Sequence, residues 1–318
     1  MPDDMKKKTD APKTPEGQGQ NAEMDDLRRA IRKLREHSRE KRKELLKPIH
    51  YRRDLPRATA PGPAVGPAAD APRRVVALEE HVPGAEVQAP RGGSAYVIER
   101  PAAGEHEHVR AVQDAFRRAF DDEASGLRAH MGELWPAGGL AADDVVFLDL
   151  ETTGLASTPL FLVGSLECEA GELVVRQYFA RDYSEEAAVI SLFAERLAAK
   201  RLLVTFNGKT FDVPYLRMRA AANAVPFKAE PPHFDLVHAC RRVWKGVLPD
   251  CRLQTLEGRI CGRWRSGDIA GELIPMAYHD YVRTHNAAQV VEILRHNVLD
   301  LLAMADLLAR LGGSTSSA

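Results

Sequence analysis

The stretch VVFLDLETTGL, residues 145–155, decides how the rest of this sequence is interpreted. It begins as an apolar run typical of a buried β-strand, yet it carries Asp149 and Glu151 two positions apart. Side chains alternate along a strand, so both carboxylates point to the same face. Like charges about 5–7 Å apart repel each other, and burial makes each harder to ionise. The pattern therefore predicts a cationic partner between the two acids, unless the strand simply ends in solvent.

Composition limits the class of protein. The chain has 318 residues, enough for one or two domains with a sizeable core. Its formal net charge of −1 argues against nucleic-acid binding through overall charge. Four cysteines form no CxxC pair, which favours reduced thiols over a disulfide framework. The N-terminus is polar and no apolar run reaches about 18 residues, so we expect a soluble cytoplasmic protein without a membrane partner.

The first part of the chain differs in charge from the rest. Residues 1–60 carry 17 Lys+Arg against 11 Asp+Glu, a balance of +6, which leaves −7 for the remainder. Between Arg28 and Arg53 there are 12 basic and 3 acidic residues. This basic helical segment is suited to an acidic or nucleic-acid partner, and a solvated helix without a dedicated ligand is an equal alternative.

The domain boundaries follow from composition and patterning. We predict disorder in 1–22, the basic helical segment in 23–55, a Pro/Ala/Gly-rich linker in 56–90, an N-terminal lead-in in 91–139, a folded domain in 140–312 and a disordered tail in 313–318.

The folded region shows alternating strand and helix patterns. The expected strands are 95–99, 145–150, 160–166, 173–179, 201–206 and 234–237, and the expected helices are 109–131, 185–199 with Ser184 as N-cap, 210–222 and 287–311. This order predicts an α/β fold: a mixed sheet of about five strands flanked by helices.

Three further polar residues stand out in apolar surroundings. Asp212 follows the strand-like run ending at Asn207-Gly208, where it would lie in the first turn of a helix. His296 and Asp300 are four apart, so they share one face of a helix that is mostly apolar. Each feature alone also fits an ordinary structural role, namely a first-turn acid or a satisfied polar pair.

Together, the Asp-x-Glu strand, the strand–Asn-Gly–helix with its early Asp, and the late His-x3-Asp helix resemble the DEDD (DnaQ-like) exonucleases of the ribonuclease-H-like superfamily. LPDCRLQTLEGRICG (248–262), GDIAGELIP (267–275) and HNVLDLLAMADLL (296–308) resemble the YprB-type ribonuclease-H-like domain family. The resemblance covers about residues 140–312. It implies a ribonuclease-H-like fold and a metal-dependent 3′→5′ exonuclease acting on the 3′ ends of single-stranded DNA or RNA.

The resemblance also implies a two-metal mechanism. Asp149, Glu151, Asp212 and Asp300 would be the catalytic, metal-binding carboxylates for two Mg²⁺ or Mn²⁺ ions. Asp149 would bridge the ions, Glu151 and Asp300 would complete one site, and Asp212 would hold the second ion.

His296 is the candidate general base, because histidine titrates near about 6.5 and can accept a proton from water at neutral pH. The spacing departs from the family pattern, in which a three-residue gap before the last Asp usually follows Tyr. His296 would therefore occupy the place of that Tyr, and orienting water or binding phosphate are alternative roles.

Thr152, Thr153 and Leu155 resemble positions that hold a terminal nucleotide, and Asn207 and Phe211 are candidates to line the same pocket. Turn or packing roles are equally compatible with these five residues. Asp235 is expected to be structural, as a helix N-cap. The competing function is a non-cleaving nucleic-acid-binding or protein-interaction module on an exonuclease-like fold.

Overall fold

A computed structural model describes residues 76–105, 108–121, 125–154, 157–227 and 231–313. The chain divides into two units, Met1–Ala69 and Asp70–Ala318, and every described residue belongs to the second unit. The predicted disordered segment 1–22, the basic segment 23–55 and residues 314–318 of the predicted tail lie outside the described residues.

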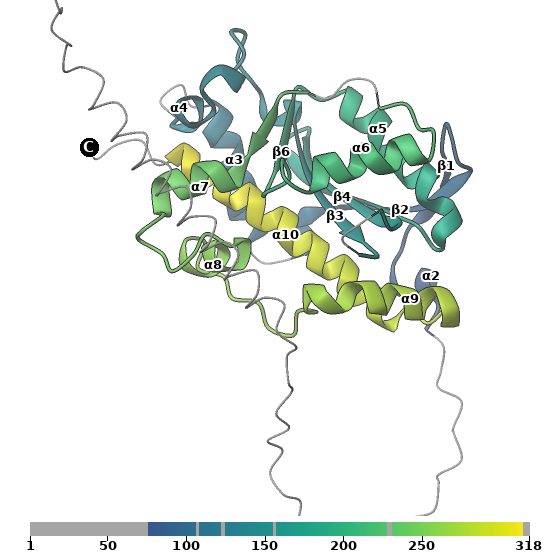
Figure 1. Ribbon diagram of the computed structural model, residues 1–318. Helices are drawn as coiled ribbons and strands as arrows, with labels where there is room; N and C mark the ends of the chain where they lie inside the picture. The colour runs from purple at the N-terminus through teal and green to yellow at the C-terminus, as the bar shows by residue number, and fades with distance from the viewer. Residues whose placement is uncertain (1–75, 106–107, 122–124, 155–156, 228–230, 314–318) are drawn as a thin grey trace, which may run out of the picture. The chain divides into compact units, whose positions relative to one another are not determined.

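The described residues form one mixed seven-stranded sheet (Figure 1). The strand order is β1-β2-β5-β4-β3-β6-β7. Strands β3, β6 and β7 run parallel, and the other neighbours pair antiparallel. The strands are β1 (Ala85–Gln88), β2 (Ser94–Pro101), β3 (Val145–Thr152), β4 (Leu160–Glu169), β5 (Glu172–Phe179), β6 (Leu202–Thr205) and β7 (His233–Asp235).

The predicted fold class is confirmed, but the strand count of about five is too low. Strand β1 lies inside the predicted linker 56–90, and β2 lies inside the predicted lead-in 91–139. The linker boundary is therefore wrong at its C-terminal end, and the lead-in is part of the sheet. Strand β1 is a mostly exposed edge strand of four residues, so its sequence AEVQ lacks the apolar alternation of a half-buried strand.

The helices are α2 (Leu78–His81), α3 (Val109–Asp121), α4 (Leu127–Met131), α5 (Glu186–Ala198), α6 (Asp212–Ala222), α7 (Leu236–Trp244), α8 (Leu253–Arg259), α9 (Ile274–Thr284) and α10 (Ala288–Gly313). The expected helix 109–131 is two helices, α3 and α4. The expected N-cap Ser184 is wrong, since Asp182 accepts the Ser184 amide and starts a 3₁₀ turn that precedes α5. Across the described residues, each helix is too short or too polar to cross a lipid bilayer.

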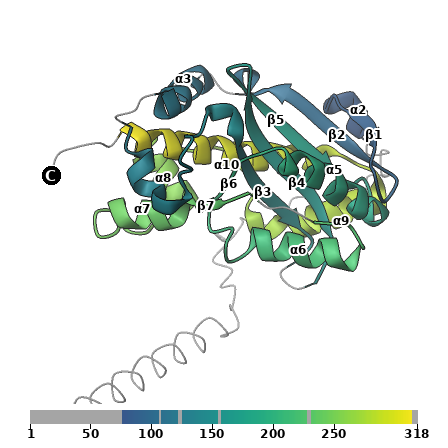
Figure 2. The same cartoon turned by 90° about the horizontal axis from the view of Figure 1, so that it is seen from above.

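Strand β3 separates two apolar clusters on opposite faces of the sheet. Val146 and Leu148 pack in the cluster that contains residues of α5 and α6. Val145 and Phe147 pack in the cluster that contains α3 and much of α10. Figure 2 shows α10 running across the sheet, with α3 beside it. The alternation of β3 therefore assigns its odd-numbered residues to the side of α10.

A row of polar contacts fixes α10 on the sheet. Asp149 of β3, Gly164 of β4 and Gln177 of β5 lie opposite one another in register. Buried Asn297 of α10 lies across this row: its Nδ2 donates to Asp149 Oδ2 at 2.8 Å, and its Oδ1 accepts from Gln177 Nε2 at 2.9 Å. Gln177 Nε2 also donates to the Leu294 carbonyl at 2.8 Å. A Cβ atom at Gly164 would collide with the Asn297 amide, so only glycine leaves room for this bridge.

We expect Gly164→Ala to lower the free energy of unfolding by about 1–3 kcal/mol, because the added methyl displaces the Asn297 amide from a packed interface. Chemical denaturation of the full chain measures this change. Gly104→Ala is the matched control, because no atom lies within 4 Å of a Cβ placed at Gly104. Equal unfolding midpoints for the two variants would contradict the assigned role of Gly164.

Candidate active site

Asp149 and Glu151 lie at the end of β3 on the face covered by α10. Both follow Phe147 in the alternation of the strand, and Phe147 packs against Val298 of α10 in one core cluster. Their side chains are half-buried. The register between β3 and β4 shifts directly after Glu151, so the regular ladder ends where the two acids stand.

Asp212 comes to β3 through the loop between β6 and α6. Asn207 turns the chain with a φ of 64°, and Asp235 holds the loop by accepting the backbone amides of Asn207 at 2.7 Å and Lys209 at 3.0 Å. Helix α6 then begins at Asp212, which is buried and has its carboxyl within reach of the Leu150 amide of β3. The local turn therefore delivers a third carboxylate to the end of the same strand.

Asp235 has the structural role expected of it. Its carboxylate is the N-cap of α7 and accepts the Val237 amide at 3.2 Å. It also contributes to the negative charge that acts on Asp212.

Helix α10 supplies Asp300 and His296. Asp300 Oδ1 forms an ion pair with Arg265 at 2.6 Å. His296 Nε2 lies 3.7 Å from Asp300 Oδ2, which is too long for a direct hydrogen bond. On the other edge of the imidazole, His296 Nδ1 lies 3.0 Å from both carboxylate oxygens of Asp268.

The Asp268 contact determines the tautomer of His296. A carboxylate only accepts hydrogen bonds, so Nδ1 carries the proton and donates it to Asp268. Nε2 of the neutral ring then has a free lone pair on the side of Asp300. Burial raises the pKa of Asp268, but the hydrogen bond from His296 and the charge of Arg265 hold that pKa below its ordinary value.

The pKa values of Asp149, Glu151 and Asp212 are raised, first by burial and then by the charges of neighbouring carboxylates. Burial and then the charge of Asp300 raise the pKa of Asp149 well above its ordinary value, although the Asn297 hydrogen bond opposes the shift. Burial and the charges of Asp300 and Asp212 do the same to Glu151. Burial is also the main cause that raises the pKa of Asp212 to about 7. Like charges couple in this way only at short range, so the fold gathers the side chains.

The cationic partner expected between Asp149 and Glu151 is not present among the described side chains. Arg265 pairs with Asp300, and no lysine or arginine in the described ranges forms an ion pair with Asp149, Glu151 or Asp212. Within those same ranges, no three His, Cys, Asp or Glu side chains lie together at the spacing of a preformed metal site.

The five residues proposed for the nucleotide pocket have mixed positions. Thr152 and Thr153 are buried, and their hydroxyls donate to the carbonyls of Gly154 and Pro159, which is a turn-forming role. The other three residues differ: Asn207 is exposed in the turn, Phe211 packs on Tyr215 at 5.3 Å between ring centroids, and Leu155 lies outside the described residues.

Sequence patterns missed Asn297, Arg265 and Asp268 as members of the site. Asn297 and Asp300 are three apart on α10, so an amide in that apolar helix was a usable signal. Arg265 and Asp268 lie in the irregular segment between α8 and α9, where no periodicity shows which side chains turn inward.

Comparison with known proteins gives one family. The model of a family in the RNase H superfamily matches residues 146–312, more than half of the chain. The protein YprB of Bacillus subtilis (strain 168), which is described as uncharacterized, is 32% identical over 176 residues. That match covers 54% of this chain and 42% of YprB, so the chain spans less than half of its relative's length.

Two solved structures are similar at lower levels. The family B DNA polymerase of the hyperthermophilic archaeon Pyrobaculum calidifontis is 18% identical, with 52% of this chain and 24% of the polymerase covered at a TM-score of 0.43. E. coli exonuclease I in complex with a dA16 oligonucleotide is 17% identical, with 47% and 42% covered at a TM-score of 0.30. At these scores neither structure carries an argument about activity. The family match over residues 146–312 shows that the chain belongs to the RNase H superfamily, and the mixed sheet agrees with this assignment.

Proposed function

We propose that this protein is a metal-dependent 3′→5′ exonuclease that hydrolyses phosphodiester bonds of single-stranded nucleic acid with two Mg²⁺ or Mn²⁺ ions. The observation that carries the proposal is the convergence of Asp149, Glu151, Asp212 and Asp300 from three separate elements. Membership in the RNase H superfamily supports the reaction class.

The chemistry of the four side chains fits divalent cations. Magnesium and manganese prefer oxygen ligands, and these groups offer only carboxylate oxygens. Mutual repulsion among half-buried and buried acids costs folding energy, and a bound cation relieves that cost. In this proposal Asp149, Glu151, Asp212 and Asp300 would together hold the two ions. When bound, the ions would supply charge stabilisation for the entering and leaving oxygens of phosphoryl transfer.

His296 is the group proposed to move the proton. Its Nε2 faces the side of Asp300 and accepts the proton of the attacking water, while Asp268 holds the ring through Nδ1. Asp268 also stabilises the imidazolium that forms, because its carboxylate lies 3.0 Å from Nδ1. Arg265 fixes Asp268 at 3.1 Å and Asp300 at 2.6 Å, so one guanidinium keeps both acids in place.

We expect Asp149→Ala to lower the rate of nucleotide release by at least about 10³-fold, because it removes one of the proposed metal ligands. The assay uses 5′- and 3′-labelled DNA and RNA with the full chain, with and without Mn²⁺. Loss of the 3′ label first indicates the proposed polarity. If Asp149→Ala still releases nucleotides in a metal-dependent way, the assignment of Asp149 as a metal ligand is wrong. If wild-type protein binds the oligonucleotides but releases no nucleotide, the non-cleaving binding module is favoured.

We expect Asp212→Asn to raise the melting temperature at pH 8, and to raise it by less than half as much at pH 5. The pKa of Asp212 is raised from 3.8 to about 7 in the folded protein, so its charge destabilises the fold fully above about pH 7. As pH falls toward 3.8, the folded protein takes up the proton first and the destabilisation disappears. The difference between variant and wild type therefore closes through this window.

The same melting experiment tests metal binding without relying on activity. At pH 8, Mn²⁺ should raise the melting temperature of wild-type protein and raise that of Asp212→Asn less. Asp280→Asn is the control, because Asp280 is half-exposed on α9 and pairs only with nearby Arg283 in the described structure. A shift with Mn²⁺ that is identical in all three proteins would contradict a metal role for Asp212.

We expect Asp268→Asn to lower kcat by about 10–100-fold and leave KM nearly unchanged, because an amide no longer fixes the tautomer of His296. The Mn²⁺-induced rise in melting temperature should persist, since Asp268 is not a proposed ligand. Asp280→Asn again serves as the control. An equal loss of the Mn²⁺ response and of kcat would instead indicate that Asp268 supports the carboxylates themselves.

A further inference from the structure

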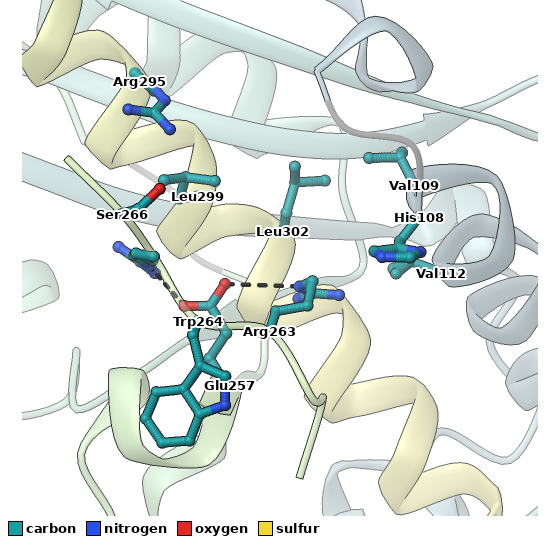
Figure 3. Close-up of a pocket in the computed structure, with 11 residues that line it drawn as sticks. His108, Val109, Val112, Glu257, Arg263, Trp264, Ser266, Arg295, Leu299 and Leu302 are labelled. Atoms are coloured by element: carbon teal, nitrogen blue, oxygen red, sulfur yellow. Dashed lines mark hydrogen bonds and ion pairs between the residues drawn. The ribbon is translucent and has the colours of Figure 1, made fainter. Parts of the chain in front are cut away.

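A hollowed surface follows the segment Arg263–Asp268. Three adjoining hollows share Arg263, and two of them share Trp264. Their volumes are about 120, 480 and 500 Å³, and the larger two fall within the usual range of ligand sites, roughly 300–1,000 Å³. We call this surface the Trp264 groove. Figure 3 shows one of these hollows, with Leu299 and Leu302 on α10 and Val109 at the start of α3.

Buried charges of both signs line the Trp264 groove, since the side chains of Arg263 and Arg265 are 14% and 7% exposed, but the most exposed of its charged side chains are arginines. The side chains of Glu257 and Asp306 are 3% and 7% exposed, and they form the floor. The side chains of Arg295 and Arg310 are 49% and 43% exposed, and they stand at the opening. A ligand approaching from solvent therefore meets arginines first, which suits a polyanion.

Trp264 is placed for stacking rather than for packing in the core. The residue is 68% exposed. One edge of its ring lies against α8 at Gly258, where a Cβ would come within 2.7 Å of two ring carbons. The guanidinium of Arg259 lies 5.5 Å from the ring centroid. Nucleobases of single-stranded nucleic acids stack on exposed aromatic rings that lie close to arginines. Trp264, which packs against Gly258 and lies beside Arg259, has this arrangement.

Two residues that line the Trp264 groove also contact side chains of the candidate active site. Arg265 lines two of the hollows and forms the 2.6 Å ion pair with Asp300. Asp268 lines one of those hollows and holds His296 at 3.0 Å. The groove therefore adjoins the candidate active site on the side of Asp300 and His296.

We propose that the Trp264 groove binds the single-stranded nucleic acid that follows the reacting 3′-terminal nucleotide, with a base stacked on Trp264 and phosphates facing Arg259, Arg295 and Arg310. This inference rests on the proposed nuclease function and extends it, because it assigns the path of the substrate beyond the cleaved bond. Base stacking and phosphate contacts are independent of sequence, so the groove binds strands of any sequence.

The test measures binding separately from cleavage. Fluorescence anisotropy of a labelled oligothymidylate, with the full chain in EDTA, gives the Kd without turnover. We expect Trp264→Ala to raise the Kd about tenfold, equal to about 1.4 kcal/mol, and Trp264→Phe to stay within about threefold of wild type. Arg295→Ala should lower the slope of log Kd against log salt concentration by about 0.7, as expected for one lost phosphate contact on a single strand.

Two variants on α9 are the matched controls. Met276 is 65% exposed, close to the value for Trp264, and the side chain of Arg283 is 73% exposed. Neither lines the three hollows of the Trp264 groove. Met276→Ala and Arg283→Ala should therefore bind the oligonucleotide as wild type does.

The outcomes separate this inference from the proposed function, because release of labelled nucleotide is assayed apart with Mn²⁺. If wild-type protein releases nucleotides in a metal-dependent way and Trp264→Ala binds with an unchanged Kd, the role of the Trp264 groove is rejected. The proposed nuclease function is then retained. Tight binding that requires Trp264, without any release, supports the groove and overturns the nuclease. No oligonucleotide binding by wild-type protein overturns the groove as well.

Discussion

Four carboxylates held close together repel one another, and much of the described structure holds them there. Burial is the first cause that raises the pKa values of Asp149, Glu151 and Asp212, and repulsion from neighbouring carboxylates adds to it. The bridge through Asn297 opposes it, because that amide donates to Asp149 while its other end is held by Gln177. Gly164 leaves the space in which the bridge fits. This row of contacts ties α10, which carries Asp300, to β3, which carries Asp149.

The second constraint is a single guanidinium. Arg265 lies between Glu257, Asp268 and Asp300, at 2.6, 3.1 and 2.6 Å. It connects the irregular segment after α8 to the last helix, so a segment without regular structure acquires a defined place. Arg265 also positions Asp268, and Asp268 in turn orients the ring of His296, the proposed base.

The carboxylate site and the Trp264 groove have opposite charge on the surfaces they present. Acidic oxygens meet at the ends of β3 and α6, whereas arginines stand at the opening of the neighbouring groove. A nucleic-acid strand is repelled by the first surface and attracted by the second. Cations bound by the carboxylates would remove that repulsion, so metal and substrate binding are expected to support each other.

The sequence alone predicted most of the strands and helices of the sheet fold, and it identified the carboxylates and the histidine of the candidate site. The alternation in VVFLDLETTGL placed Asp149 and Glu151 on one face of a strand, and the four-residue spacing placed His296 and Asp300 on one face of a helix. Both patterns depend only on residues that are close together in the sequence. It also predicted the mixed sheet, although it missed the exposed edge strand β1, whose burial pattern carries no apolar signal. The tertiary structure alone decided the roles of Asn297, Arg265 and Asp268, and the position of Trp264 beside Gly258. These roles depend on contacts between residues far apart in the chain, and such contacts exist only once the chain has packed, whereas local periodicity is present in the unfolded sequence.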